Sequence, residues 1–353
     1  MLQRNSRIGL RLILFLLFMQ LAVWAQNTSA PAAPPRSSQP ASTQPPSDAH
    51  EPPDGQTPAT EAGGFVFHSD VQEVLLHATV IDDKQRMITN LDKNAFTVFE
   101  DGKPQVIKSF RHEDIPISLG IVIDNSGSMR EKRAKVNRAA LNLVRASNPQ
   151  DEVFVVNFND EAYLDQDFTS NISLLREGLE HIEARGGTAL YDAVVGSAEQ
   201  LAKGAKQQKK VLLVVTDGED NASRESLEDA VRIVQGYAGP TVYTIGLLGD
   251  DRQAKRARRA LERLSLETGG VAYFPKDLSE VDEISRSVAH DIRNQYTIGY
   301  KPSRPQSEGG FRQVKVEAHG DGRTKLQVRT RSGYYASQKQ ASAEPAPTTQ
   351  TSR

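Results

Sequence analysis

The sequence predicts an α/β fold: a doubly wound, mostly parallel sheet flanked by helices, together with a small β-sandwich-like domain. Two observations carry this prediction. Between about residues 116 and 293, continuous apolar runs of strand length alternate with amphipathic helical stretches, a pattern typical of parallel sheets covered on both faces. Before and after that region lie blocks rich in β-branched and aromatic residues, which are typical of strands.

The central region, residues 116–293, supplies the elements of the predicted parallel sheet. Its strands are expected where apolar residues run without interruption, and its helices where they recur every three to four positions. The expected strands are Leu119–Ile123, Val153–Phe158, Val211–Thr216, Val242–Leu248 and Val271–Phe274. The expected helices lie near 131–147, 172–184, 190–204, 224–237, 252–267 and 279–293. The short segment Ala162–Leu164 is expected to add an antiparallel edge strand.

The flanking blocks, residues 64–115 and 294–336, are expected to pair with each other. Each is too small to form a good sandwich alone, so we predict one β-domain into which the central region is inserted. Asp101-Gly102 predicts a hairpin turn between two of the strands. The expected strands are Glu73–Ile81, Phe96–Phe99, Val106–Phe110, Gln295–Tyr300, Phe311–Ala318 and Lys325–Thr330.

The two ends of the chain differ from this core. Residues 1–25 combine three arginines with the apolar run Leu12–Trp24 and a small-residue cleavage site at Val23–Ala25, which predicts a secretory signal peptide. An uncleaved anchor is the alternative, although the run is shorter than the roughly 20 residues of a membrane span. Residues 26–63 and the tail 337–353 are rich in Pro, Ser, Ala and Thr, which predicts disordered segments. We therefore expect an exported protein, periplasmic or extracellular.

Composition excludes several kinds of site. The 353 residues include no cysteine, which rules out disulfides, thiolate metal sites and cysteine nucleophiles. The formal net charge is -2, so the bulk charge offers no case for nucleic acid or an anionic membrane as partner. The basic run from Arg252 to Arg263 is the one local exception, and we interpret it as a solvated helix face.

Three polar loops follow strands or precede helices of the central region. Asp124 ends the first expected strand and opens a loop that carries Ser126 and Ser128, with Gly127 between them to let the chain curl. Asp217 ends another strand, and Thr188 directly precedes a helix. Because doubly wound sheets place their sites where the strand order reverses, we expect these side chains to meet at one edge of the sheet.

The five side chains offer only hard oxygen donors, two of them anionic. If the two carboxylates face each other across the crevice, each destabilises the charge of the other unless a cation lies between them. Such a donor set suits Mg²⁺, Mn²⁺ or Ca²⁺ and is poor for Zn²⁺ or Cu²⁺. We therefore predict one divalent cation, Mg²⁺ first among these, held by Asp124, Ser126, Ser128, Thr188 and Asp217, with a coordination position open to a partner's carboxylate.

The loops Asp124-x-Ser126-x-Ser128, Thr188 and Thr216-Asp217-Gly218 resemble the metal-ion-dependent adhesion site (MIDAS) of von Willebrand factor A and integrin I domains. The resemblance covers about residues 116–293 and matches all five positions of the motif. It implies that the two serines and the threonine bind the metal directly or nearly so, that the aspartates often act through water, and that an acidic ligand group completes the octahedron. More loosely, the flanking segments Phe96–Gly102 and Tyr296–Tyr300 resemble secreted bacterial von Willebrand A-related proteins.

Simpler interpretations of the same residues exist. Ser128 alone could cap the helix at 131–147, and Thr188 the helix at 190–204, because Ser and Thr are common cap residues. The alternative is then a degenerate, metal-free remnant of the site. No base lies near the two serines in sequence, and no Gly-x-Ser-x-Gly nucleophile motif or lysine-containing phosphate loop is present. These absences argue against an enzyme.

Three functions follow in order of preference. The first is an exported, metal-dependent protein-binding or adhesion module that captures an Asp or Glu carboxylate of a protein partner, with no catalytic residues, no nucleic-acid partner and no membrane span after signal cleavage. The second is a metal-independent structural scaffold of a cell-envelope assembly. The third is a metal-assisted hydrolase. The sequence leaves the partner and the oligomeric state open.

Overall fold

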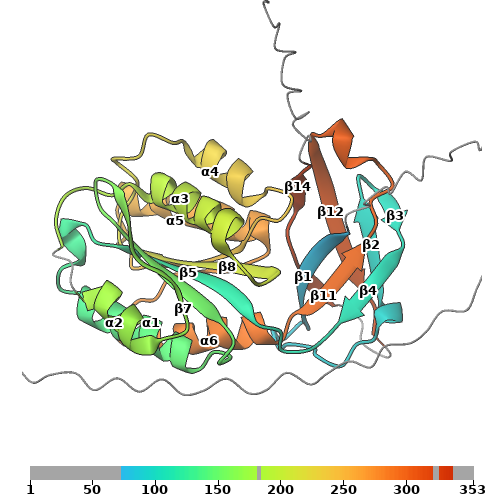
Figure 1. Cartoon of the computed structure of the whole chain (residues 1–353), viewed down its shortest axis with the longest axis horizontal. Coiled ribbons are helices and arrows are strands. Elements are labelled where there is room, and N and C mark those ends of the chain that lie inside the picture. Colours follow the sequence, from blue (N-terminus) through green and yellow to red (C-terminus); the bar gives the residue numbers. More distant parts are fainter. Residues whose placement is uncertain (1–72, 181–183, 321–325, 337–353) are drawn as a thin grey trace, which may run out of the picture. The chain divides into compact units, whose positions relative to one another are not determined.

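The α/β part (Figure 1) contains a six-stranded sheet, and its strand order is β10-β9-β8-β5-β6-β7. The computed structural model describes residues 73–180, 184–320 and 326–336. All pairs in this sheet are parallel except β6 with β7, where the edge strand runs antiparallel. The strands are β5 (Ile117–Asp124), β6 (Glu152–Phe158), β7 (Ala162–Thr169), β8 (Lys209–Thr216), β9 (Thr241–Gly246) and β10 (Ala272–Tyr273).

Strand β5 lies at the centre of this sheet, because the side chains on both of its faces are suited to burial. All eight of its residues are buried, as expected for a continuous apolar run in a parallel sheet. Gly120 is required within it: a Cβ at this position would lie 2.4 Å from the ring of Phe154 and 2.6 Å from a methyl group of Leu212. The two neighbouring strands therefore pack closely over the middle of β5.

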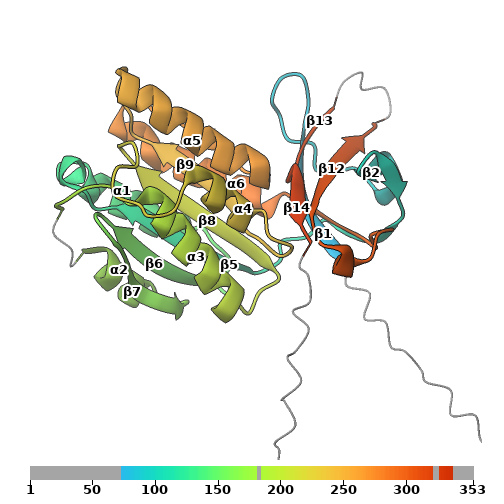
Figure 2. The same ribbon diagram turned by 90° about the horizontal axis from the view of Figure 1, so that it is seen from above.

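Helices cover both faces of the sheet (Figures 1 and 2). Alternate residues of β5 point to opposite cores: Ile121 packs with residues of α1, α2 and α6, and Val122 with residues of α3, α4 and α5. This is the doubly wound arrangement that the strand–helix alternation predicts. The helices are α1 (Arg133–Arg145), α2 (Ile172–Glu180), α3 (Leu190–Gly204), α4 (Leu227–Val234), α5 (Arg252–Thr268) and α6 (Val281–Arg293).

The β-domain consists of two four-stranded antiparallel sheets, in the orders β13-β1-β11-β4 and β14-β12-β2-β3. Strands from before and after the α/β part pair in both sheets, with Leu76 opposite Ile298 and Val98 opposite Val316. The predicted fold class is thus confirmed, including the pairing of the two flanking blocks. The strands are β1 (Val74–Ile81), β2 (Phe96–Glu100), β3 (Lys103–Gln105), β4 (Ile107–Arg111), β11 (Tyr296–Tyr300), β12 (Phe311–Ala318), β13 (Gln327–Arg329) and β14 (Gly333–Tyr335).

The hairpin at Asp101-Gly102 differs from the prediction in its second arm. Both turn residues have positive φ, 48° and 76°, as a tight two-residue hairpin turn requires. The arm that pairs with β2 is β3, not the expected Val106–Phe110 segment. At Val106 the chain leaves this sheet, and β4 pairs with β11 in the other one. The hydrophobic pattern of 106–110 predicts a strand but not the sheet that it joins.

Two further elements differ in length from the predictions. The edge strand expected at Ala162–Leu164 extends to Thr169 as β7. The helix expected at 224–237 is only the eight-residue α4. Its start is fixed by Ser226, whose hydroxyl accepts a hydrogen bond of 3.1 Å from the backbone N–H of Asp229, as an N-cap residue does.

All described residues belong to the contact unit that starts at Phe67. Within this unit, Asp291 at the end of α6 ties the α/β part to the β-domain: its carboxylate accepts hydrogen bonds from Thr79 of β1 (2.9 Å), Arg329 of β13 (2.8 Å) and Tyr243 of β9 (2.8 Å). The predicted signal peptide, linker and tail lie outside the described residues. No helix of the described ranges is long and apolar enough to cross a bilayer.

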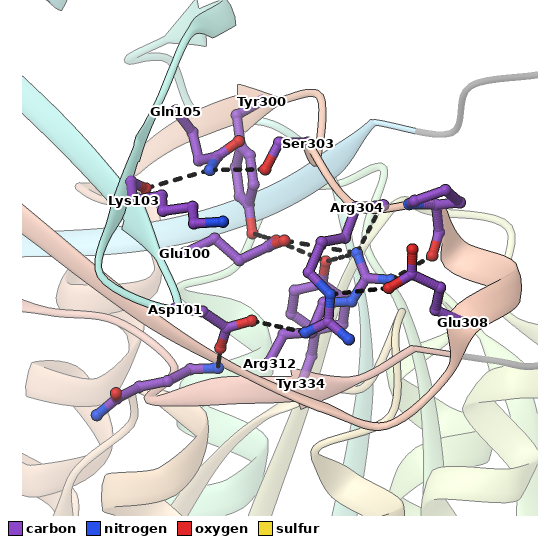
Figure 3. Close-up of polar contacts among 12 residues, drawn as sticks. Glu100, Asp101, Lys103, Gln105, Tyr300, Ser303, Arg304, Glu308, Arg312 and Tyr334 are labelled. Atoms are coloured by element: carbon purple, nitrogen blue, oxygen red, sulfur yellow. Dashed lines mark hydrogen bonds and ion pairs between the residues drawn. The ribbon is translucent and has the colours of Figure 1, made fainter.

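A buried polar cluster lies between the two sheets of the β-domain (Figure 3). The carboxylate of Glu100 accepts hydrogen bonds from the hydroxyls of Tyr300 (2.6 Å) and Tyr334 (2.8 Å). Arg312 forms an ion pair with Glu100 at 3.5 Å and donates to the carbonyl oxygen of Arg304 at 2.9 Å. Glu100 and Arg312 are 1% and 0% exposed, so water contributes almost nothing to their neutralisation.

Candidate metal site

The two predicted carboxylates leave the sheet at the same edge. Asp124 is the last residue of β5, and Asp217 directly follows β8, the parallel neighbour of β5. Between these two strands the strand order reverses, since β6 continues on one side of β5 and β8 on the other. The site therefore lies at the switch point where doubly wound sheets bind ligands.

The serine loop places its two hydroxyls beside Asp217. A short 3₁₀ turn, Gly127–Met129, curls the chain after Ser126. As a result, the Ser126 and Ser128 hydroxyl oxygens lie 3.2 Å apart, and Ser128 donates a hydrogen bond of 2.7 Å to Oδ1 of Asp217. The backbone N–H of Ser126 donates to Oδ1 of Asp124 at 2.7 Å. Four of the five predicted side chains thus form one connected cluster.

Thr188 reaches the same cluster on a loop held by Asn221. The Asn221 side-chain oxygen accepts from the backbone N–H of Thr188 at 2.9 Å, and the backbone N–H of Asn221 donates to the carbonyl of Thr188 at 3.0 Å. The Thr188 hydroxyl lies over Gly218, where a Cβ would be 3.6 Å from it. The structure therefore brings all five residues to one edge of the sheet; their role as metal ligands stays a prediction.

The simpler cap interpretation of Ser128 and Thr188 is wrong. Helix α1 begins after Lys132 and α3 after Ala189, and neither helix has a side-chain cap hydrogen bond. The Ser128 hydroxyl is directed to Asp217 instead. Neither side chain is thus explained by helix capping.

Asp124 is a fully buried carboxylate that touches only neutral donors. Its side chain accepts hydrogen bonds from the Ser126 N–H and, at 2.6 Å, from the Thr216 hydroxyl. Burial raises the pKa of Asp124; the hydrogen bonds from Thr216 and Ser126 oppose that rise, and the charge of Asp217 adds to it. The sequence placed Thr216 in the loop that carries Asp217 but did not indicate that its hydroxyl contacts Asp124.

Lys132 is a second residue that the sequence analysis missed. Its ammonium group forms an ion pair with Oδ2 of Asp217, whose side chain is only 1% exposed. Lys132 follows Asp124 by eight residues, and nothing in its local sequence distinguishes it from the neighbouring arginines and lysines. The ion pair neutralises part of the negative charge at this edge of the sheet.

The donor set fits a hard divalent cation. Within the described ranges, no group of three or more His, Cys, Asp or Glu side chains could hold a metal ion. A cation at this edge would therefore rely on hydroxyls together with the two carboxylates, as Mg²⁺, Mn²⁺ and Ca²⁺ accept. The residues that would hold it are Asp124, Ser126, Ser128, Thr188 and Asp217, and the ammonium group of Lys132 would have to move away from Asp217.

Half of the cations in the basic run on α5 make contacts with other side chains at the surface. Arg256 forms a two-pronged ion pair with Glu219, and Arg263 pairs with Glu228 at 2.7 Å. The guanidinium of Arg258 lies 3.8 Å from the centre of the Phe274 ring. These contacts use three of its six cations, and all six side chains remain exposed, in agreement with the interpretation of the run as a solvated helix face.

Comparisons with known proteins find similarity in this part of the chain. Residues 119–219 match the model of the von Willebrand factor type A domain family. An uncharacterized Synechocystis protein, sll0103, is 28% identical over 135 residues, which are 37% of this chain and 32% of that protein. Inter-alpha-trypsin inhibitor heavy chain H4 of Bos taurus is 24% identical over 211 residues, 55% of this chain and 22% of that protein. The matches therefore span a third or less of these relatives.

Solved structures with a similar arrangement are more distant. A von Willebrand factor type A protein from Catenulispora acidiphila is 15% identical with a TM-score of 0.44, covering 76% of this chain and 75% of that one. The PilB minor pilin from Streptococcus sanguinis is 14% identical with a TM-score of 0.43, covering 54% and 64%. At these scores the likeness adds nothing to the family match. The matched segment runs from β5 to Glu219 and so includes all five predicted ligand residues: this segment of the chain matches the von Willebrand factor type A domain family.

Proposed function

We propose that this protein is an exported binding module that captures an acidic group of a protein partner through one divalent cation, Mg²⁺ first among the candidates. Asp124, Ser126, Ser128, Thr188 and Asp217 hold the cation in this proposal. The observation that carries it is their convergence: three loops far apart in sequence bring five hard oxygen-bearing side chains, and no sulfur or imidazole, to one edge of the sheet.

The charge balance supports a cation rather than a closed polar cluster. Two carboxylates face this edge, and Asp124 meets only neutral donors. Taking a carboxylate out of water is costly. Lys132 pairs with Asp217, and Arg133 donates to the backbone carbonyl of Asp124 but not to its carboxylate. A dication between the two carboxylates would neutralise both of them directly. When bound, the cation supplies a positively charged site with a vertex for an incoming Asp or Glu carboxylate.

The organisation of the whole chain is part of the proposal. The signal peptide at 1–25, the linker at 26–63 and the tail at 337–353 are proposed from sequence, as are the boundaries of the α/β part at 116–293 and of its flanking segments at 64–115 and 294–336. No catalytic residue and no nucleic-acid partner is proposed.

A capture experiment tests the function. Asp-containing and Asn-containing versions of one peptide library are passed over the immobilised protein in Mg²⁺ and then in EDTA. We expect retention of acidic peptides only in Mg²⁺, and its loss in Asp124→Ala and Ser126→Ala while circular dichroism shows an unchanged fold. Equal retention in EDTA would contradict the proposal and favour the metal-independent scaffold.

A further inference from the structure

A cavity lies at the opposite end of the α/β sheet from the candidate metal site. Its volume is about 520 Å³, within the range of roughly 300 to 1,000 Å³ of small-molecule sites. Lys210 and Thr241, near the starts of β8 and β9, form one side, and residues of β1, β4 and β11 form the other. Asp217 follows the other end of β8, roughly 20 Å away at about 3.3 Å per residue.

The lining of this cavity carries more positive than negative charge. Four cationic side chains contribute to it, against the single carboxylate of Glu73, whose Oε1 accepts a hydrogen bond from Ser109 at 2.9 Å. None of the four forms an ion pair within the described residues. They are Arg111, Lys206, Lys210 and Arg331.

Arg331 is the most deeply placed of these cations, at 8% exposed. Its guanidinium donates to the backbone carbonyls of Gly333 (3.1 Å), Tyr237 (3.1 Å) and Gly236 (2.6 Å). Burial lowers the pKa of Arg331 to about 10, so the group stays charged at neutral pH. The carbonyls hold the guanidinium in a fixed orientation, but they neutralise its charge only in part, since a guanidinium has five N–H donors and three are used.

His77 adds hydrogen-bonding capacity without adding charge. Its Nδ1 lies 3.3 Å from the hydroxyl of Thr297 on the neighbouring strand. Removal from water lowers the pKa of His77 well below its usual range, and the charges of Lys209 and Arg331 lower it further. The ring is therefore neutral at pH 7 and can donate or accept one hydrogen bond beside the cations.

Apolar side chains complete the wall. Leu75 and Ile115 line the cavity on the side of the β-domain, and Tyr237 and Ala238 on the side of the α/β part. A ligand that fits this wall carries an anionic group for the cations and an apolar body for the remainder. An inorganic anion alone would leave the apolar surface in contact with water.

We propose that this cavity binds a small organic anion, with its carboxylate or phosphate group held by Arg111, Lys210 and Arg331 and its apolar body against Leu75, Ile115 and Tyr237. The site works independently of the divalent cation, because it lies at the other end of the sheet and shares no residue with the candidate metal site. This would be a second function of the protein, and it does not rest on the function proposed above.

Isothermal titration of the full chain in EDTA tests the proposal. The probes are 2-naphthoate, 2-naphthyl phosphate and decanoate, with 2-naphthamide as the neutral match of 2-naphthoate and inorganic phosphate as an anion without an apolar body. We expect at least one organic anion to bind, and 2-naphthamide and inorganic phosphate to bind about tenfold or more weakly, the usual effect of losing one charge-assisted contact or the apolar burial. The preferred head group distinguishes carboxylate from phosphate ligands.

Matched variants locate the binding. Arg111→Gln combined with Lys210→Gln is expected to weaken the best anion about tenfold or more, because two charge-assisted contacts are lost. Arg259→Gln, which removes an exposed cation of α5, should leave the affinity unchanged, and so should Asp124→Asn in the candidate metal site. Circular dichroism confirms that each variant is folded. Failure of all three organic anions to bind, equal binding of 2-naphthamide, or full affinity in the double variant would overturn the proposal.

Discussion

Two buried carboxylates in this protein are neutralised in different ways. Glu100 of the β-domain is met by two tyrosine hydroxyls and by the guanidinium of Arg312 (Figure 3). Asp124 of the α/β part is met by one hydroxyl and one backbone N–H, with the carboxylate of Asp217 nearby. The first cluster contains its own counter-charge and can serve structure alone. In the second, Lys132 pairs with Asp217, and Arg133 donates to the backbone carbonyl of Asp124 rather than to its carboxylate. This incomplete neutralisation supports the proposal of an external cation there.

The largest effect is expected from removing the counter-charge of Glu100 in the β-domain. Arg312→Met removes the guanidinium and leaves Glu100 buried against neutral hydroxyls, which should destabilise the fold by about 3–5 kcal/mol in urea unfolding. Arg304→Met is the control, because Arg304 pairs with Asp101 and Glu308 at the surface and its loss should shift the midpoint far less. Similar losses in the two variants would show that Glu100 does not depend on Arg312.

The second prediction concerns the candidate metal site around Asp124 and Asp217. In Mg²⁺ at a hundred times its Kd, the wild-type protein should gain about 2.7 kcal/mol of stability over the protein in EDTA. Asp217→Asn removes one of the two carboxylates and should abolish this gain in thermal unfolding. Glu225→Gln, at an exposed position before α4, is the control and should keep the gain. A gain in the Asp217 variant equal to that of wild type would place the cation elsewhere.

The third prediction concerns Lys209, a buried cation, and the dependence of stability on pH. Lys209 donates a hydrogen bond to the carbonyl of Ile292, and burial lowers its pKa to about 8, although the charges of Asp291 and Asp114 oppose this. Between pH 8 and the usual value of 10.5 the unfolded chain holds more protons than the folded one, so stability should rise with pH in this window. The rise is at most about 1.4 kcal/mol per pH unit.

Urea unfolding of wild type and Lys209→Met between pH 7.5 and 10 measures this rise. The difference between the two proteins isolates the contribution of Lys209 from those of other groups. The variant curve should be flatter over the window from about 8 upward. Parallel curves would mean that the lysine keeps its usual pKa in the folded state.

The smallest effect is expected at Lys132, whose ammonium group forms an ion pair with the carboxylate of Asp217. Because a divalent cation must displace this group, Lys132→Met should tighten Mg²⁺ binding about tenfold, or about 1.4 kcal/mol, as measured by isothermal titration. Lys135→Met, an exposed position on α1, serves as the control and should bind Mg²⁺ like wild type. Unchanged or weaker binding in the Lys132 variant would show that the lysine does not compete.

The five candidate ligands could be named from sequence because their signals are local. Asp124 and Asp217 each end an apolar strand, and the Ser-Gly-Ser pattern carries its own loop geometry. Their partners could not be named in this way. Asn221 positions Thr188 from 33 residues away, and Lys132 reaches Asp217 across 85 residues. Residue type and spacing do not encode such contacts, because many other asparagines and lysines would look the same.

By itself, the sequence determined which segments become strands and helices and which loops carry oxygen donors, because apolar periodicity and turn residues act over a few positions. Only the tertiary structure decided that β3 rather than β4 completes the hairpin of β2, that Glu100 meets Arg312 across 212 residues, and that four cations surround one cavity. Strand partners and counter-charges are chosen by packing over the whole chain, where long-range burial outweighs any local preference.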